Sequence, residues 1–208
     1  MKLGADYGRL AFGPLKVSCL RSVSGAELCS ASTSRHAVSS MANSLYQASV
    51  PAFLQMLNSL SAILDKAEAY AAERRIDPAV LLGWRLAPDM FALTRQVQIA
   101  TDHAKGCCAR LAGVEVPKYP DDETTFADLR ARIARTIDFV RGFEPSAIDG
   151  SEERDITITA SGREIRFKGQ QYLVNFVLPN FYFHVTTAYA ILRHCGLPIG
   201  KRDFMGVR

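Results

Sequence analysis

The sequence lacks most of the features that mark a catalytic or a nucleotide-binding protein. It has no internal repeats and no phosphate-binding glycine loop, and its five cysteines form no C-x-x-C pair and no zinc-ligand spacing. An odd number of cysteines without a secretory signal is typical of reduced thiols. We therefore expect a cytoplasmic protein.

Charge is scarce as well, and it is unevenly distributed. The formal net charge is +4, of which residues 1–40 contribute +3 through five basic and two acidic side chains, so that residues 41–208 carry only +1. General binding of nucleic acid requires a basic face. The near-neutral body of the chain therefore argues against a nucleic-acid partner.

A long stretch near the end of the chain has no charge at all. From Gln170 to Leu192 there is no Asp, Glu, Lys or Arg, and the run is long enough to cross a bilayer. It nevertheless contains two glutamines, two asparagines, a proline, a histidine and two threonines. This is too polar for a single span and typical of a buried helix, so we predict no membrane association.

Residues 1–40 differ in composition from the rest. They are rich in serine, poor in acidic residues and without a sustained helical or strand period. They are either an organellar transit peptide, which has this composition, or an extension upstream of the true start, because a well-patterned segment opens at Met41. We favour the second interpretation, with a disordered segment 1–40 and one domain over residues 41–208.

Apolar residues recur at helical spacing in four long segments. We predict helices over residues 44–75, 88–112, 125–141 and 170–196. Pro179 should kink the last of them. Before it, DITITA and REIRFK alternate with period two around Ser161-Gly162, which indicates a β-hairpin. The predicted fold class is mainly α: an up-down four-helix bundle with a small hairpin inserted before the last helix.

Two polar side chains lie on the apolar face of the last helix, one turn apart. Burying the amide of Asn180 and the imidazole of His184 costs about 1–3 kcal/mol each unless both find partners. They therefore either close a structural hydrogen-bond network or form the functional site.

The second predicted helix carries polar residues beside its apolar seam. Asp89, Gln96 and His103 are spaced seven residues apart on one line, and Arg95 and Asp102 form a second line. Such residues are often just the polar border of an amphipathic helix. If the border turns inward, it faces the last helix.

Several kinds of site remain open. Two ligands at i and i+4 on one helix suit a metal, but the residue four before His184 is Asn180, a poor ligand for zinc or nickel. A histidine beside Asp102 or Asp89 would suit acid–base chemistry, and a lone buried histidine is also often a satisfied core residue. Aromatic residues around polar groups suit a small-molecule pocket. The candidate pocket residues are Asp89, Arg95, Gln96, Asp102, Asn180, Tyr182 and His184.

Three stretches of the sequence resemble a known family. RLAPDMFALTRQVQIATDHAKG, the following RLAG, and PNFYFHVTTAYAILRHCGLPIGKRDF are similar to the family called domain of unknown function 1993, over about Met41 to Met205. That family resembles the DinB/YfiT-like superfamily of four-helix bundles. Many members of this superfamily bind a divalent metal through three histidines, and many form dimers. Some members are metal-dependent thiol transferases. The resemblance implies this fold and a homodimer.

The same resemblance bears on the metal. In the superfamily one ligand lies on the second helix and two lie four apart on the last. By this comparison His184 matches the final ligand, Asn180 stands in place of its partner, and the second helix offers Gln96 and Gln98 instead of a histidine. We therefore expect a protein without a metal cofactor that binds a small molecule or serves as a scaffold. The alternative is a divalent-metal-dependent transferase or hydrolase, with zinc, nickel or iron on His184.

Overall fold

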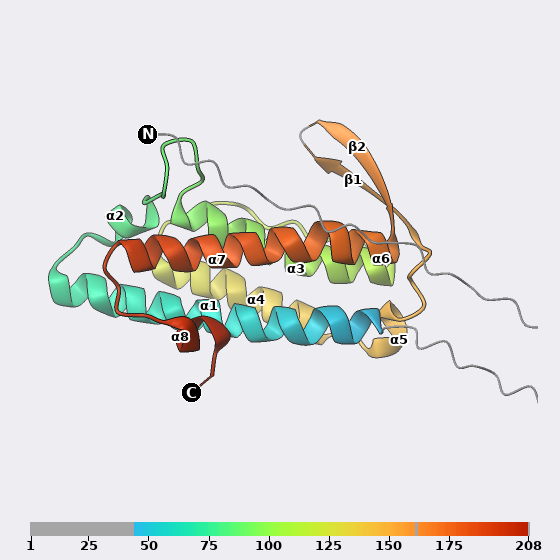
Figure 1. Ribbon diagram of the computed structural model, residues 1–208, viewed down its shortest axis with the longest axis horizontal. Coiled ribbons are helices and arrows are strands. Elements are labelled where there is room, and N and C mark those ends of the chain that lie inside the picture. The colour runs from blue at the N-terminus through green and yellow to red at the C-terminus, as the bar shows by residue number, and fades with distance from the viewer. Residues whose placement is uncertain (1–43, 161, 208) are drawn as a thin grey trace, which may run out of the picture. The chain divides into compact units, whose positions relative to one another are not determined.

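The structure is a computed structural model that describes residues 44–160 and 162–207, which form a helical bundle (Figure 1). Its four long helices are α1 (Leu45–Arg74), α3 (Leu93–Ala112), α4 (Phe126–Arg141) and α7 (Leu178–His194). The predicted mainly α fold with one hairpin before the last helix is confirmed. The predictions for residues 1–40 lie outside the described residues.

Shorter elements connect and extend the long helices. They are α2 (Pro78–Leu82), α5 (Pro145–Ile148), β1 (Asp155–Ala160), β2 (Arg163–Lys168), α6 (Gly169–Gln171), the π-helical segment η1 (Tyr172–Val177) and α8 (Lys201–Met205). The two strands pair antiparallel with Ile158 opposite Ile165. The hairpin lies beside the end of the bundle that holds α5 and α6 (Figure 1).

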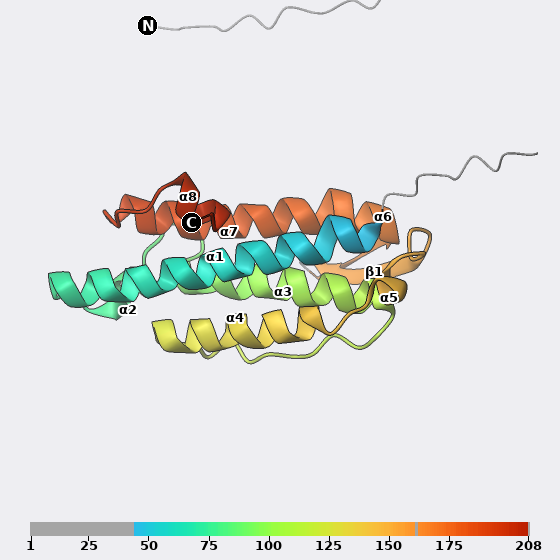
Figure 2. The ribbon, with the colours of Figure 1, turned by 90° about the horizontal axis from the view of Figure 1, so that it is seen from below.

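Apolar side chains from all four long helices form the core. Phe53 of α1 and Phe181 of α7 are fully buried, and their rings meet edge to face with centroids 4.9 Å apart. Helix α3 packs chiefly against α7 and α4, and the four helices run side by side (Figure 2). A polar side chain on α3 that turns away from solvent therefore finds its partners on α7 or on the α4 side.

Helix α3 begins at Leu93, five residues later than the sequence predicted. The backbone N–H of Leu93 donates to the carbonyl of Trp84, and the hydroxyl of Thr94 donates to the carbonyl of Leu82. These two bonds fold residues 83–92 back as a loop that joins α2 to α3. Asp89 therefore lies in that loop and not on the helical line that Gln96 and His103 share.

The last helix is interrupted by a wider turn. In η1 the N–H of Leu178 bonds to the carbonyl of Leu173, five residues earlier instead of four. Pro179 has no N–H, so it cannot form the usual helical bond to the carbonyl of Asn175, four residues earlier. A wider turn at this position therefore breaks no hydrogen bond of Pro179. The distortion expected at Pro179 thus takes the form of a π-helical segment. No helix in the described part of the chain is long and apolar enough to cross a bilayer.

A buried arginine fixes the connection between α3 and α4. The side chain of Arg132 is 2% exposed, and its guanidinium lies 2.8 Å from Asp102, 3.0 Å from Asp121 and 2.9 Å from Glu123. Its Nε donates to the hydroxyl of Thr101 at 2.8 Å. Three carboxylates and a hydroxyl therefore satisfy a charge that would otherwise be costly to bury.

Tyr119 lies at the centre of this connection. Its ring has Nζ of Lys105 at 4.6 Å and the guanidinium carbons of Arg135 and Arg132 at 4.0 and 5.5 Å from the centroid. Cations over an aromatic face are attracted by its quadrupole. The connection is thus held by charge and by the tyrosine ring together.

Replacing Arg132 by Met tests this arrangement. The variant keeps the aliphatic length but leaves Glu123 and Asp102 without their buried partner, so we expect the free energy of unfolding to fall by about 3–5 kcal/mol. Arg135→Met removes an exposed cation and should cost less than about 1 kcal/mol. Urea denaturation measures both, and equally small losses would contradict the role given to Arg132.

Candidate functional site

The candidate site lies where α7 meets α3. His184 of α7 is 8% exposed, and its Nδ1 is 2.7 Å from Oε1 of Gln96 on α3, which is 1% exposed. Nε2 of Gln96 donates to the backbone carbonyl of Phe91 at 3.1 Å. A single chain of hydrogen bonds therefore joins the loop before α3 to the imidazole on α7.

This chain determines the tautomer of His184. The carbonyl of Phe91 can only accept, so the amide nitrogen of Gln96 must face it and the amide oxygen must face His184. An amide oxygen can only accept, so Nδ1 of His184 carries the proton that it donates. In a neutral imidazole the other nitrogen, Nε2, then has a free lone pair.

The atom that carries the free lone pair of His184 keeps some exposure to solvent. Within the described residues Nε2 has no hydrogen-bond partner. Among the described side chains, Nη1 of Arg130 is the one completely buried nitrogen or oxygen that lacks a partner. Since Nε2 of His184 also lacks a partner, it is not completely buried. Nε2 can therefore accept a hydrogen bond, or a proton, from a molecule that enters from solvent.

Aromatic rings surround the imidazole of His184. The ring of His103, two turns after Gln96 on α3, lies 5.9 Å from it with the two planes 17° apart. Phe176 meets His103 edge to face at 5.7 Å, and Phe183 meets His184 in the same way at 5.3 Å. The immediate neighbours of the imidazole are therefore largely aromatic.

Both histidines are neutral at pH 7. Burial lowers the pKa of His184 to about 4, and the guanidinium of Arg95 acts in the same direction. Burial and the neighbouring His184 lower the pKa of His103 to about 4, although the carboxylate of Asp102 opposes the shift. Two neutral imidazoles side by side can accept hydrogen bonds without repelling each other.

The other five candidates from the sequence have different surroundings. Arg95 bonds to Gln98 and Asp121 and acts on His184 through its charge, whereas Asp102 pairs with Lys105 and Arg132 and not with a histidine. Asp89 and Tyr182 are exposed, and their side chains have no hydrogen-bond partner among the described residues.

Asn180 is used within its own helix. Its amide donates to the carbonyl of Phe176 at 2.6 Å, next to the π-helical segment and one residue after Pro179. It is a local bond from a side chain to the carbonyl four residues earlier, like that of Asn58 to Leu54 in α1. Within the described residues no hydrogen bond joins Asn180 to His184 or Gln96.

The three-histidine metal site of the resembling superfamily does not fit these residues. The amide of Gln96 is committed to Phe91 and His184, and the amide of Asn180 is committed to Phe176. In the described part of the chain no three His, Cys, Asp or Glu side chains converge as metal ligands. A catalytic zinc site needs three protein ligands, and the aligned positions offer one imidazole nitrogen.

His103 is the site residue that the sequence-based candidate set missed. Its spacing was a usable signal, because a residue seven positions after Gln96 lies two turns along the same helix face. The role of Phe91 had no such signal, since its backbone carbonyl is used and not its side chain. Backbone groups take part whatever the residue type, so composition does not reveal them.

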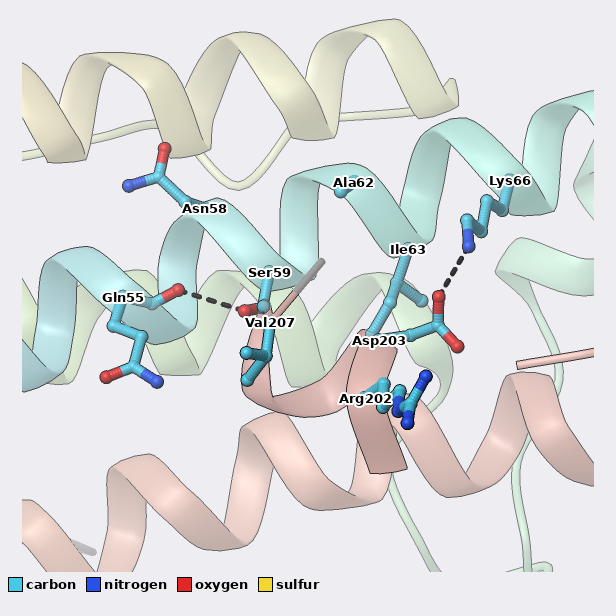
Figure 3. Close-up of a pocket in the computed structure, with 10 residues that line it drawn as sticks. Gln55, Asn58, Ser59, Ala62, Ile63, Lys66, Arg202, Asp203 and Val207 are labelled. Atoms are coloured by element: carbon cyan, nitrogen blue, oxygen red, sulfur yellow. Dashed lines mark hydrogen bonds and ion pairs between the residues drawn. The ribbon is translucent and has the colours of Figure 1, made fainter. Parts of the chain in front are cut away.

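A separate groove lies between α1 and α8. It has a volume of about 360 Å³ and shares no lining residue with the histidine site (Figure 3). Lys66 pairs with Asp203 across it, and Gln55 donates to the carbonyl of Met205. Because Lys66, Asp203 and Gln55 already have partners, we prefer the free lone pair of His184 as the candidate site.

Known proteins support the fold and leave the chemistry open. The family model described as "Domain of unknown function (DUF1993)" matches residues 45–205. A crystal structure described as a DinB family member protein from Shewanella denitrificans is 44% identical, with a TM-score of 0.71, over 79% of this chain and 93% of that one. The comparison with curated proteins gives no match.

The stability of the protein should fall between pH 6.5 and pH 4. An unfolded histidine has a pKa of about 6.5, whereas His103 and His184 have a pKa of about 4 in the folded state. In this range the unfolded chain binds more protons, so the free energy of unfolding decreases by up to about 1.4 kcal/mol per pH unit for each histidine as the pH falls.

Urea denaturation at a series of pH values measures this slope. His103→Gln should lower the slope by about one proton, and His194→Gln, at the exposed end of α7, is the matched control. A slope that does not change in His103→Gln would contradict the assignment of a neutral histidine pair.

Proposed function

The chain belongs to the family described as Domain of unknown function (DUF1993), and we propose that it binds a small molecule between α3 and α7 through Nε2 of His184. A shared fold does not by itself assign an activity, so the function is inferred from the site. The observation that carries the proposal is the hydrogen bond from Nδ1 of His184 to Gln96. It holds the imidazole in the one tautomer that presents a free acceptor.

The surroundings suit an organic ligand. Specific pockets usually combine apolar or aromatic walls with a few fixed polar groups. Here the rings of His103, Phe176 and Phe183 supply the wall, and Nε2 of His184 supplies the fixed polar group. A bound molecule would need a hydroxyl or N–H donor, because a neutral imidazole nitrogen can only accept.

Binding is favoured over hydrolysis or group transfer. Among the residues that the structure describes, no set of three metal ligands includes His184, and Asp102, a carboxylate considered for acid–base work, is committed to Lys105 and Arg132. A histidine without these partners retains its ability to orient a ligand. In the metal-dependent alternative, a metal on His184 would need two further protein ligands. Asn180, Gln96 and Gln98, which match the other ligand positions of the superfamily, do not supply them.

Phenol and anisole form a matched pair of probes for this function. Both carry the same ring, but only phenol has a donor for Nε2 of His184. We expect phenol to shift the amide NMR signals around His184 and Gln96 and to bind at least about fivefold more tightly than anisole, as one neutral hydrogen bond contributes about 1 kcal/mol.

Two variants identify the acceptor. His184→Asn keeps an N–H for Gln96 but has no atom at the position of Nε2, so it should bind phenol and anisole equally. His194→Asn, on an exposed turn of the same helix, should keep the preference for phenol. Equal binding of the two probes by the unmodified protein would rule out the proposed function.

A further inference from the structure

We propose that the site between α3 and α7 selects small aromatic acids, whose carboxylate pairs with Arg95 while a hydroxyl on the ring donates to Nε2 of His184. This inference rests on the proposed function and adds to it the charge of the ligand and the residue that recognises that charge.

Arg95 has donors left for a ligand. It directly precedes Gln96 on α3, and both of its hydrogen bonds, to Gln98 and Asp121, are made by Nη1. Its Nε and Nη2 have no partner among the described residues, and its side chain is 39% exposed. The guanidinium fork can bind a carboxylate through two parallel N–H groups, and such charge-assisted bonds are about twice as strong as neutral ones.

Arg95 is also electrostatically coupled to the imidazole. Its positive charge acts with burial to keep His184 neutral. A guanidinium that disfavours a second cation beside it favours an anion in the same place. The charge therefore distinguishes an acidic ligand from a basic one, which the neutral histidines do not do.

The carboxylates on α3 and on the connection that follows it are already paired with cations. The stretch from Gln170 to Leu192, which supplies the α7 side of the site, contains no acidic residue. On the α3 side, Asp102 pairs with Lys105 and Arg132, and Asp121 is shared by Arg95 and Arg132. Apart from Asp89 in the loop before α3, these carboxylates therefore have cationic partners before a ligand arrives.

Exposed aromatic side chains supply a surface for the ring of such a ligand. Phe183, whose ring meets His184 edge to face, and Phe91, whose carbonyl holds Gln96, are each 56% exposed. Large aromatic side chains left in solvent next to fixed polar groups are typical of binding sites. Together with Arg95 they favour a flat, apolar body that carries one negative charge.

Three probes separate the contributions to binding. 4-Hydroxybenzoate has both the carboxylate and the hydroxyl, methyl 4-hydroxybenzoate keeps only the hydroxyl, and 4-methoxybenzoate keeps only the carboxylate. In NMR titrations at pH 7 we expect 4-hydroxybenzoate to bind at least about tenfold more tightly than its methyl ester, because a hydrogen bond to a charged group contributes about 1.5–3 kcal/mol.

Variants of Arg95 assign this preference to its source. Arg95→Gln should remove the preference, so that 4-hydroxybenzoate and its methyl ester bind equally. Arg95→Lys keeps the charge but not the fork and should retain only part of the preference. Arg85→Gln, which removes an exposed arginine from the loop before α3, should behave like the unmodified protein.

The outcomes distinguish this inference from the proposed function. If the acid and its ester bind equally, and Arg95→Gln changes neither, the preference for acids is wrong while the preference for phenol over anisole still stands. If 4-methoxybenzoate binds as tightly as 4-hydroxybenzoate in both the unmodified protein and His184→Asn, the hydroxyl contact is wrong. Failure of phenol and of all three benzoate probes to bind overturns both proposals.

Discussion

The hydrogen bond between His184 and Gln96 is the constraint on which the site depends. Helix α7 brings an imidazole into the bundle on a stretch without a single charged residue, and its hydrogen-bond partner comes from helix α3. Gln96 can serve because Phe91 holds its amide in one orientation. The carbonyl of Phe91 accepts from the amide nitrogen of Gln96, and the amide oxygen of Gln96 accepts from Nδ1 of His184. The lone pair of His184 is therefore left on Nε2.

Helix α3 carries this bond on one side and an ion network on another. Toward α7 it presents Gln96 and His103, whereas toward α4 it presents Asp102 to the buried guanidinium of Arg132. The ion network fixes the connection between α3 and α4 and leaves the histidines free of strong ion pairs. A buried charge and a neutral acceptor can therefore coexist on one helix.

Sequence patterns predicted the architecture well and the site only in part. Apolar periodicity located the four helices, and the start predicted at residue 125 agrees with the capping box that Thr125 and Asp128 form before α4. The start of α3 was misjudged because tertiary bonds from Leu93 and Thr94 override the local pattern. Helical spacing placed His184 inward but could not tell that Asn180 would bond to its own helix. An asparagine on a helix can bond to the carbonyl four residues earlier, as Asn58 also does in α1, and spacing does not reveal which choice it makes.

The tautomer of His184 is the most direct test of how the site is built. Long-range ¹H–¹⁵N NMR of the imidazole reports which ring nitrogen carries the proton. The bond to Gln96 predicts a proton on Nδ1 and none on Nε2 at pH 7, in a ring that stays neutral to about pH 5 because its pKa is about 4. A proton on Nε2, or a charged imidazole at pH 6, would contradict the free acceptor on which the binding site rests.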